Sequence, residues 1–258
     1  MKYNIVLFIS LIFSFSSISN PQGSSGENAK FEYRSLIDMP TAGILEKGFV
    51  GLTTEILPDG VLIETIEVGV FNNISFGISY GGSNVIGRGT PDWYKIPAVN
   101  IRFRIFNESV TMPAITAGFD SQGKGLYFDQ ANRYSIKSPG FFGAVSKNFA
   151  FLGYLSLHGS VNYSLEGKDG DNFVNFLIGF EKTLGENLSV IGEYDLAFND
   201  NETDSFGAGS GYLNMGLRWA VGEGFTIGFD LRDLLKNKKW SPGSADRALR
   251  IEFIQSIF

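Results

Sequence analysis

The chain has 258 residues, a formal net charge of −6 and no cysteine, which excludes disulfides and a lipid-anchored N-terminal cysteine. It has no basic patch, so we do not expect nucleic acid as a partner. The 32 glycines and 24 phenylalanines are spread along the chain, as is typical of curved antiparallel sheets.

The N-terminus has the pattern of an export signal. Lys2 gives a positive start, residues 5–15 form a short apolar core, and small residues at 17–19 offer a cleavage point. An uncleaved membrane helix is the alternative, but the apolar run is too short to span a bilayer comfortably. We therefore expect a cleaved signal peptide at 1–19. A lead-in segment at 20–48 follows, which we expect to lie at or in the mouth of a barrel.

Twelve segments of about ten residues then alternate between apolar and polar side chains, and no later apolar run is long enough for a membrane helix. The predicted strands are 49–57, 61–70, 74–82, 97–106, 112–121, 139–148, 153–165, 172–183, 187–198, 210–221, 225–235 and 248–258.

The connections between these strands alternate too. Tight turns are expected around 71–73, 107–109, 147–151, 185–187 and 222–224, and long polar loops at 83–96, 122–138, 199–209 and 236–247. Short connections at 58–60 and 166–171 fall on the long-loop side. Short periplasmic turns and long external loops are typical of outer-membrane barrels. We predict an all-β fold, an antiparallel transmembrane β-barrel of about 12 strands over residues 49–258, with both ends of the barrel in the periplasm.

A soluble β-sandwich also shows alternation and is the alternative fold. The export signal, the even strand count and the asymmetry of the loops favour the barrel. The chain also ends in a strand closing on Phe258, the kind of aromatic terminus that outer-membrane barrels present to their assembly machinery. We therefore expect the bacterial outer membrane as the location, with its lipid and lipopolysaccharide as partners.

Charged residues fall on the polar face of the strands, which in a barrel points into the lumen because charges facing lipid cost about 2–4 kcal/mol. One interpretation is an Arg–carboxylate network that fills a small lumen, and we favour it because small barrels are usually occupied by their own side chains. The other is a narrow pore that selects polar solutes. The candidate residues are Glu67, Arg102, Arg104, Asp120, His158, Glu181, Glu193, Asp195, Arg218, Asp230, Arg232, Arg250 and Glu252.

His158 is the single histidine and shares a face with Ser156, which raises the possibility of a membrane-embedded hydrolase. Residues two apart on one strand lie about 7 Å apart, too far for the hydrogen bond that a nucleophile and base need. A histidine in a polar lumen network is the better interpretation.

The loops carry acidic and aromatic residues. Asp169, Asp171, Asp200, Glu202 and Asp204 could bind a divalent cation, but none has the spacing of an EF-hand, so we interpret them as solvated turns. Sugar contact is conceivable through the loop aromatics, although interface girdles are the commoner reason for them; these are Trp93, Tyr94, Tyr127, Phe128 and Trp240. We expect no cofactor and no resident metal.

A consecutive series of short glycine-rich motifs suggests a family. It runs LIDMPTAGILEKG, GVFNNISFGISYGG, NVIGRG, PAVNIRFRI, GFDSQGKG, RYSIKSPGFF and AVSKNF, followed by GSVNYSLE, EYDLAFND and GYLNMGLRW. Over roughly residues 36–258 the chain resembles the YjbH-type family of bacterial outer-membrane β-barrels. Larger members of that family are associated with exopolysaccharide or capsule production. This chain is much shorter than those members, which carry additional domains, and it holds a single barrel unit.

The resemblance implies a non-enzymatic barrel linked to export or surface display of an extracellular polysaccharide, with polysaccharide or envelope proteins as partners. It transfers no catalytic residues. The alternative, from the residues themselves, is a narrow diffusion channel for small polar or charged solutes.

Overall fold

The computed structural model describes residues 26, 30–202, 204–240 and 245–257. The predicted signal peptide at 1–19 and the terminal Phe258 lie outside these residues. None of the described residues belongs to a helix long and apolar enough to cross a membrane.

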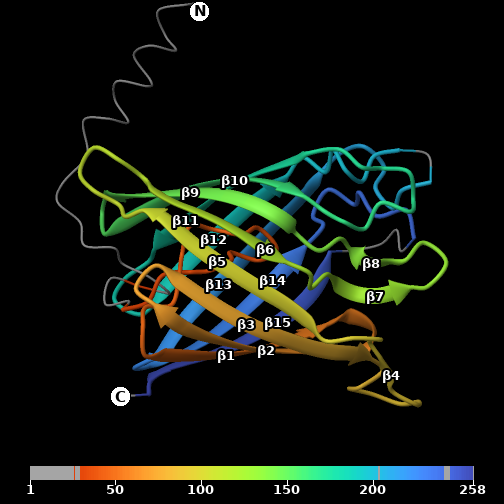
Figure 1. Cartoon of the computed structure of the whole chain (residues 1–258), viewed down its shortest axis with the longest axis horizontal. Helices are drawn as coiled ribbons and strands as arrows, with labels where there is room; N and C mark the ends of the chain where they lie inside the picture. Colours follow the sequence, from red (N-terminus) through yellow and green to blue (C-terminus); the bar gives the residue numbers. More distant parts are fainter. Residues whose placement is uncertain (1–25, 27–29, 203, 241–244, 258) are drawn as a thin grey trace, which may run out of the picture.

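Twelve antiparallel strands form a closed barrel (Figure 1). Neighbours in sequence pair with each other, and pairing of β1 with both β2 and β15 closes the sheet. This confirms the predicted fold class, with strand ends within three residues of the predicted ones. The barrel strands are β1 (Phe49–Leu57), β2 (Val61–Phe71), β3 (Ile74–Ser83), β5 (Ala98–Phe106), β6 (Ala114–Asp120), β9 (Gly140–Ala150), β10 (Tyr154–Tyr163), β11 (Asn175–Thr183), β12 (Leu188–Asp195), β13 (Tyr212–Gly222), β14 (Phe225–Arg232) and β15 (Asp246–Ser256).

Two segments predicted to be plain loops contain short strands. Residues 83–96 include β4 (Asp92–Trp93), which pairs antiparallel with the end of β3, and residues 122–138 include the hairpin of β7 (Lys124–Phe128) and β8 (Arg133–Ile136). The interpretation of these stretches as plain loops was wrong because their apolar residues pack against the strands of the barrel. They join a buried cluster at the loop end of the barrel, formed by Leu57, Val61, Ile63, Tyr94, Tyr134 and Ala248.

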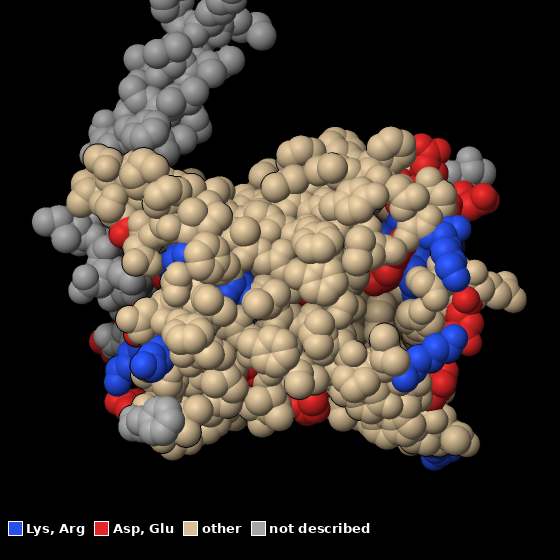
Figure 2. Space-filling model, in the orientation of Figure 1, with Lys and Arg blue, Asp and Glu red and all other residues tan. Residues whose placement is uncertain are grey.

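The outer face of the barrel is apolar around its middle. Figure 2 shows Lys, Arg, Asp and Glu gathered mainly at the two ends of the face in view. Alternate side chains along each strand, among them Ile101, Phe103 and Leu217, are about half exposed, as lipid-facing residues of a barrel are. Glu64 on β2 departs from this pattern and accepts a hydrogen bond from Thr54 Oγ1 at 2.8 Å on the neighbouring strand.

Residues 30–47, here named the inner segment, run inside the barrel. Arg34 to Thr41 form a small hairpin, in which Ser35 bridges Pro40 and Thr41 N donates to Arg34 O at 3.1 Å. The wall makes room for it with glycine. A Cβ at Gly69 would lie 1.8 Å from Glu46 O, closer than any real contact, so the segment could not pass a larger residue there.

The lipid-facing assignment predicts a position-dependent cost for a buried charge. Leu217→Arg at mid-strand should lower the free energy of unfolding by about 2–4 kcal/mol, measured by urea titration from lipid vesicles. Ile96→Arg is the matched control, since Ile96 is an exposed loop residue. Equal effects of the two substitutions would contradict the placement of the belt.

Candidate functional site

The tip of the inner hairpin binds one wall carboxylate through its backbone. The N–H groups of Ile37 and Met39 donate to Glu193 Oε2 at 2.9 and 3.0 Å, and that of Asp38 donates to Oε1 at 2.8 Å. Asn214 Nδ2 adds a fourth hydrogen bond at 2.9 Å. Charge-assisted bonds of this kind are about twice as strong as neutral ones, so Glu193 fixes the tip against β12.

Arg34 of the inner hairpin lies between two carboxylates on opposite sides of the β1 strand. Its Nε donates to Glu67 Oε2 on β2 at 2.9 Å, and its Nη2 pairs with Glu252 on β15. All three side chains are buried. Removing one partner of a buried ion pair costs about 3–5 kcal/mol, because the other charge is left uncompensated. Arg34 therefore ties the inner segment to the strands on both sides of β1.

Cations of the wall and loops complete the attachment at the hairpin tip. Arg218 donates to Leu36 O at 2.9 Å while also pairing with Asp230 at 2.5 Å. Arg232 pairs with Asp38. Lys124, from the β7–β8 hairpin, donates to Ile37 O at 2.7 Å, so one of the long loops also holds the tip.

Towards the turn end of the barrel the wall binds the backbone of the inner segment. Arg104 donates to Ala42 O at 2.7 Å and pairs with Glu32. Thr116 Oγ1 donates to the same carbonyl at 2.6 Å, and Arg102 donates to Thr41 O at 3.3 Å. The arginines of β5 thus meet the segment's own carbonyl groups.

The structure places all thirteen candidate residues on the inner side of the wall, where they form two groups. Eight bind the inner segment directly, namely Glu67, Arg102, Arg104, Glu193, Arg218, Arg232, Arg250 and Glu252. The other five hydrogen-bond to wall or loop residues, namely Asp120, His158, Glu181, Asp195 and Asp230.

His158 has a serine partner, on the neighbouring strand instead of its own. Its Nδ1 lies 2.8 Å from Ser146 Oγ, and the same oxygen accepts the N–H of Ala42 at 3.0 Å. The imidazole Nε2 is buried without a hydrogen-bond partner among the described residues. Among the residues that the structure describes, no third group orients this histidine as a general base, and the inner segment covers the serine, so the pair lacks the geometry of a hydrolase.

The sequence reasoning missed the residues of the inner segment that do the binding. Leu36, Ile37 and Met39 pack against Leu177 and Ile191, two apolar residues on the inner face. In a water-filled lumen such residues would be out of place on the polar face. An apolar pair among lumen-facing polar residues was therefore the available signal for a bound segment.

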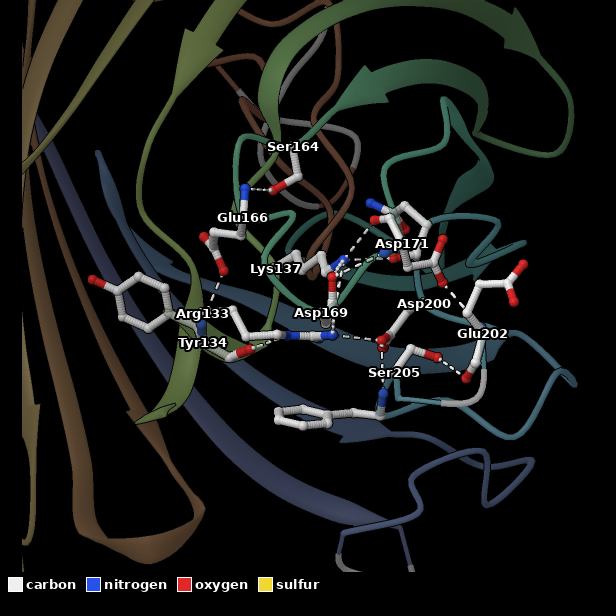
Figure 3. A network of polar contacts seen from close by, with 12 residues as sticks. Arg133, Tyr134, Lys137, Ser164, Glu166, Asp169, Asp171, Asp200, Glu202 and Ser205 are labelled. Atoms are coloured by element: carbon white, nitrogen blue, oxygen red, sulfur yellow. Dashed lines mark hydrogen bonds and ion pairs between the residues drawn. The ribbon is translucent and has the colours of Figure 1, made fainter. Parts of the chain in front are cut away.

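The long loops are joined by a buried ionic network (Figure 3). Arg133 of β8 pairs with Asp169 at 2.7 Å and with Asp200 at 2.6 Å, and Lys137 pairs with Asp169 at 2.8 Å. Asp171 accepts the N–H of Asn201 at 2.7 Å. The interpretation of these aspartates as solvated turns was wrong for Asp169, Asp171 and Asp200. Each is drawn inward by a cation or by loop amides.

Burial and charge act in opposite directions on this network. Burial alone would raise the pKa of Asp169, but hydrogen bonds and ion pairs with Lys137 and Arg133 outweigh it and lower that pKa. Burial raises the pKa of Glu166, although the N–H groups of Tyr134 and Ser138 oppose the shift. Asp169 therefore holds the loops together as a carboxylate.

The loop aromatics pack on one another at the external end. The rings of Tyr94 and Tyr134 meet edge to face with their centroids 4.9 Å apart. The centroid of Phe128 lies 4.8 Å from that of Phe206 and 6.2 Å from that of Trp240. Trp93 stacks on Tyr80 at 5.9 Å. Tyr94 is buried in the cluster at the loop end, so it is not available as a surface sugar contact.

The inner segment separates two spaces within the barrel. A cavity of about 80 Å³ lies on its loop side, where Lys124 and Lys137 belong to its lining. A larger space of about 530 Å³ lies on its turn side, bounded by Lys30, Phe49 and Glu108. With the segment in place the lumen is therefore divided into a small loop-side cavity and a wider turn-side vestibule.

Glu193→Gln should loosen the hairpin tip, because an amide replaces one acceptor oxygen with a donor that faces the backbone N–H groups. We expect faster hydrogen exchange at Ile37 and Met39, equivalent to about 1–3 kcal/mol of lost protection. Glu181→Gln is the matched control, since Glu181 accepts its hydrogen bond from Ser189 on the wall. Unchanged exchange in Glu193→Gln would contradict the role of this carboxylate.

Acid should open the external loop network. Because the pKa of Asp169 is lower in the folded protein than its ordinary value of about 3.9, its contribution to stability is full above that value and is lost as the pH falls below it. The protection factors of amides in residues 164–174, which compare observed with intrinsic exchange rates at each pH, should therefore fall below about pH 4. Asp169→Asn should abolish this loss of protection at acid pH, here called the acid limb. Asp129→Asn, in an exposed pair with Lys95, should leave it intact; an acid limb unchanged in Asp169→Asn would contradict the assignment.

No known family model matches the sequence, and no curated protein is similar to it. Among solved structures, the chain is similar to the KdgM porin with 8% identity and a TM-score of 0.47, over 81% of this chain and 99% of that chain. The same porin has been solved in complex with disordered oligogalacturonate. The NanC porin is similar with 10% identity and a TM-score of 0.42, over 80% and 98% of the two chains. The barrel assignment itself rests on the strand pairing of this chain.

Proposed function

We propose that this chain is a narrow outer-membrane channel for small polar or charged solutes, held closed by its own inner segment. The observation that carries the proposal is the attachment of residues 30–47 to the wall. Arg34, Asp38 and the backbone of the hairpin tip are held by ion pairs and hydrogen bonds. Polar contacts of this kind can be replaced by water or solute, and the apolar contacts of Leu36, Ile37 and Met39 with Leu177 and Ile191 would also be given up when the segment moves.

The wall left behind would suit an aqueous pore. Its arginines and carboxylates alternate with small polar residues such as Ser75, Asn100 and Thr116. Rings of charged side chains are a common basis for selectivity among small solutes. A lumen of this composition fits small hydrophilic molecules and repels apolar ones.

Export or display of a polysaccharide, implied by the family resemblance, stays a prediction. The cavity of about 80 Å³ beside the inner segment has no room for a polymer. Such a role would require the whole segment to leave the lumen, so we place it second to the channel.

The partners follow from the proposed location. The exposed apolar belt would contact outer-membrane lipid, and the external loops would contact lipopolysaccharide. Insertion would use the barrel-assembly machinery, acting on β15, the last strand of the barrel.

Conductance across a planar lipid bilayer tests the proposal. The full chain should give rare, small steps, while deletion of residues 30–47 should give frequent discrete steps, because the obstruction is gone. Folding of each protein is checked by its heat-modifiable mobility on gels. A folded barrel that lacks the inner segment and still conducts nothing would rule out the channel.

A point variant guards against a deletion that does not fold. Gly69→Val places a side chain where Glu46 O now lies, so it should displace the segment and raise the frequency of open steps. Gly159→Val is the matched control. Its Cβ would meet only Val145, at 3.4 Å, so it should conduct like the natural chain.

A further inference from the structure

The loop-side cavity is lined by buried polar atoms that have no partner. These are Arg34 Nη1, Ser79 Oγ, Asn100 Oδ1, Arg102 Nε and Gln122 Oε1. All five side chains are more than nine-tenths buried. Burying a polar group without a hydrogen bond is costly, so their convergence on one space indicates a site for a polar guest.

Arg102 makes no direct ion pair. Among the described residues no carboxylate lies within ion-pair distance of it, whereas Arg34 has two such partners and Arg250 has Glu252 at 3.6 Å. Its contacts are Thr41 O at 3.3 Å and the ring of Phe142 at 5.0 Å. A guanidinium left this way offers its remaining N–H groups to an anionic group, most effectively to a carboxylate.

Asp120, in the same cavity, makes no direct ion pair either. Its Oδ1 accepts the N–H of Gln122 at 2.9 Å, and no lysine or arginine of the described residues forms an ion pair with it. The unpaired amide oxygens of Asn100 and Gln122 lie in the same lining. Three acceptors of this kind are suited to an ammonium group, which carries only donors.

The strand register offsets the two charges along neighbouring strands. Asn100 on β5 is the direct partner of Asp120 on β6, and Arg102 follows Asn100 on the same face. Their backbones are therefore offset by about 7 Å along the strands. The cavity of about 80 Å³ has room for roughly five to eight water-sized groups, the size of a molecule with few heavy atoms.

We propose that the loop-side cavity is a binding site for a small zwitterion, of the size of a free amino acid. Arg102 and Arg34 Nη1 would bind its carboxylate, and Asp120, Asn100 and Gln122 its ammonium group. The site rests on the proposed function, since it names the class of solute that the channel takes. A molecule that carries both charges would give a partner to Arg102 and to Asp120 at once. An anion alone or a cation alone would leave one of these two groups without a partner.

Equilibrium binding of isotope-labelled glycine to the full chain in detergent micelles tests the site without requiring conduction. Glycine should bind saturably, and glycolate and methylamine, which each lack one charge, should bind about tenfold or more weakly. Glycerol tests for a site that takes any hydroxylated solute. Equal binding of all four probes, or no saturable glycine binding, would overturn the proposal.

Asp120→Asn should weaken glycine binding about tenfold or more and remove the preference for glycine over glycolate. Asp120→Glu keeps the charge and should retain that preference, which keeps the test valid if the asparagine variant does not fold. Asp129→Asn, at an exposed loop carboxylate, is the matched control. Unchanged binding in a folded Asp120→Asn barrel would overturn the site.

The two proposals fail separately. Conductance of the chain lacking residues 30–47 with no glycine binding to the full chain would reject the site and leave the channel. Saturable glycine binding with no conductance in any folded variant would reject the channel and keep the site as a receptor pocket.

Discussion

A charge buried in the lumen of a small barrel is costly unless an opposite charge or a hydrogen-bond donor meets it. The wall of this barrel carries more such groups than it pairs within itself. Residues 30–47 supply many of the missing partners, with Arg34 between Glu67 and Glu252 and three backbone N–H groups on Glu193. The charged groups of the wall therefore hold the inner segment in place, and the inner segment in turn stabilises the charges of the wall.

The same constraint orders the rest of the molecule. Lys124 reaches from an external hairpin to Asp38 and Ile37 of the inner segment, and Arg133 joins that hairpin to the next two loops. Displacing the inner segment would thus also break the contacts of Lys124 with Asp38 and Ile37. The inner segment in the lumen and the loops joined through Lys124 and Arg133 therefore stabilise each other.

The barrel could be predicted from the sequence because the period of two repeats over twelve strands. In strand 225–235, for example, Phe229 and Leu231 face outward while Asp230 and Arg232 face inward. The short strands β7 and β8 could not be predicted, since Tyr134 of β8 packs on Tyr94 of a different loop. Periodicity carries no information about such contacts between distant segments.

The inward charges were also readable, but their partners were not. Alternation places Glu193 and Arg218 on the lumen side without showing that a hairpin of the same chain fills the space between them. The inner glycines Gly69 and Gly179 and the inner apolar residues Leu177 and Ile191 were signals of it. They acquire that meaning only once the path of residues 30–47 is known.

Cross-linking tests most directly whether the inner segment occupies the lumen in a membrane. The natural chain has no cysteine, so a pair can be introduced at Asp38 and Asn214, whose Oδ2 and Nδ2 atoms lie 3.3 Å apart. A short bifunctional thiol reagent should join them in the bilayer-inserted barrel and suppress its open steps. It should not join Asp38→Cys to Glu223→Cys at the turn rim. No cross-link between positions 38 and 214 in a folded, inserted barrel would contradict the account.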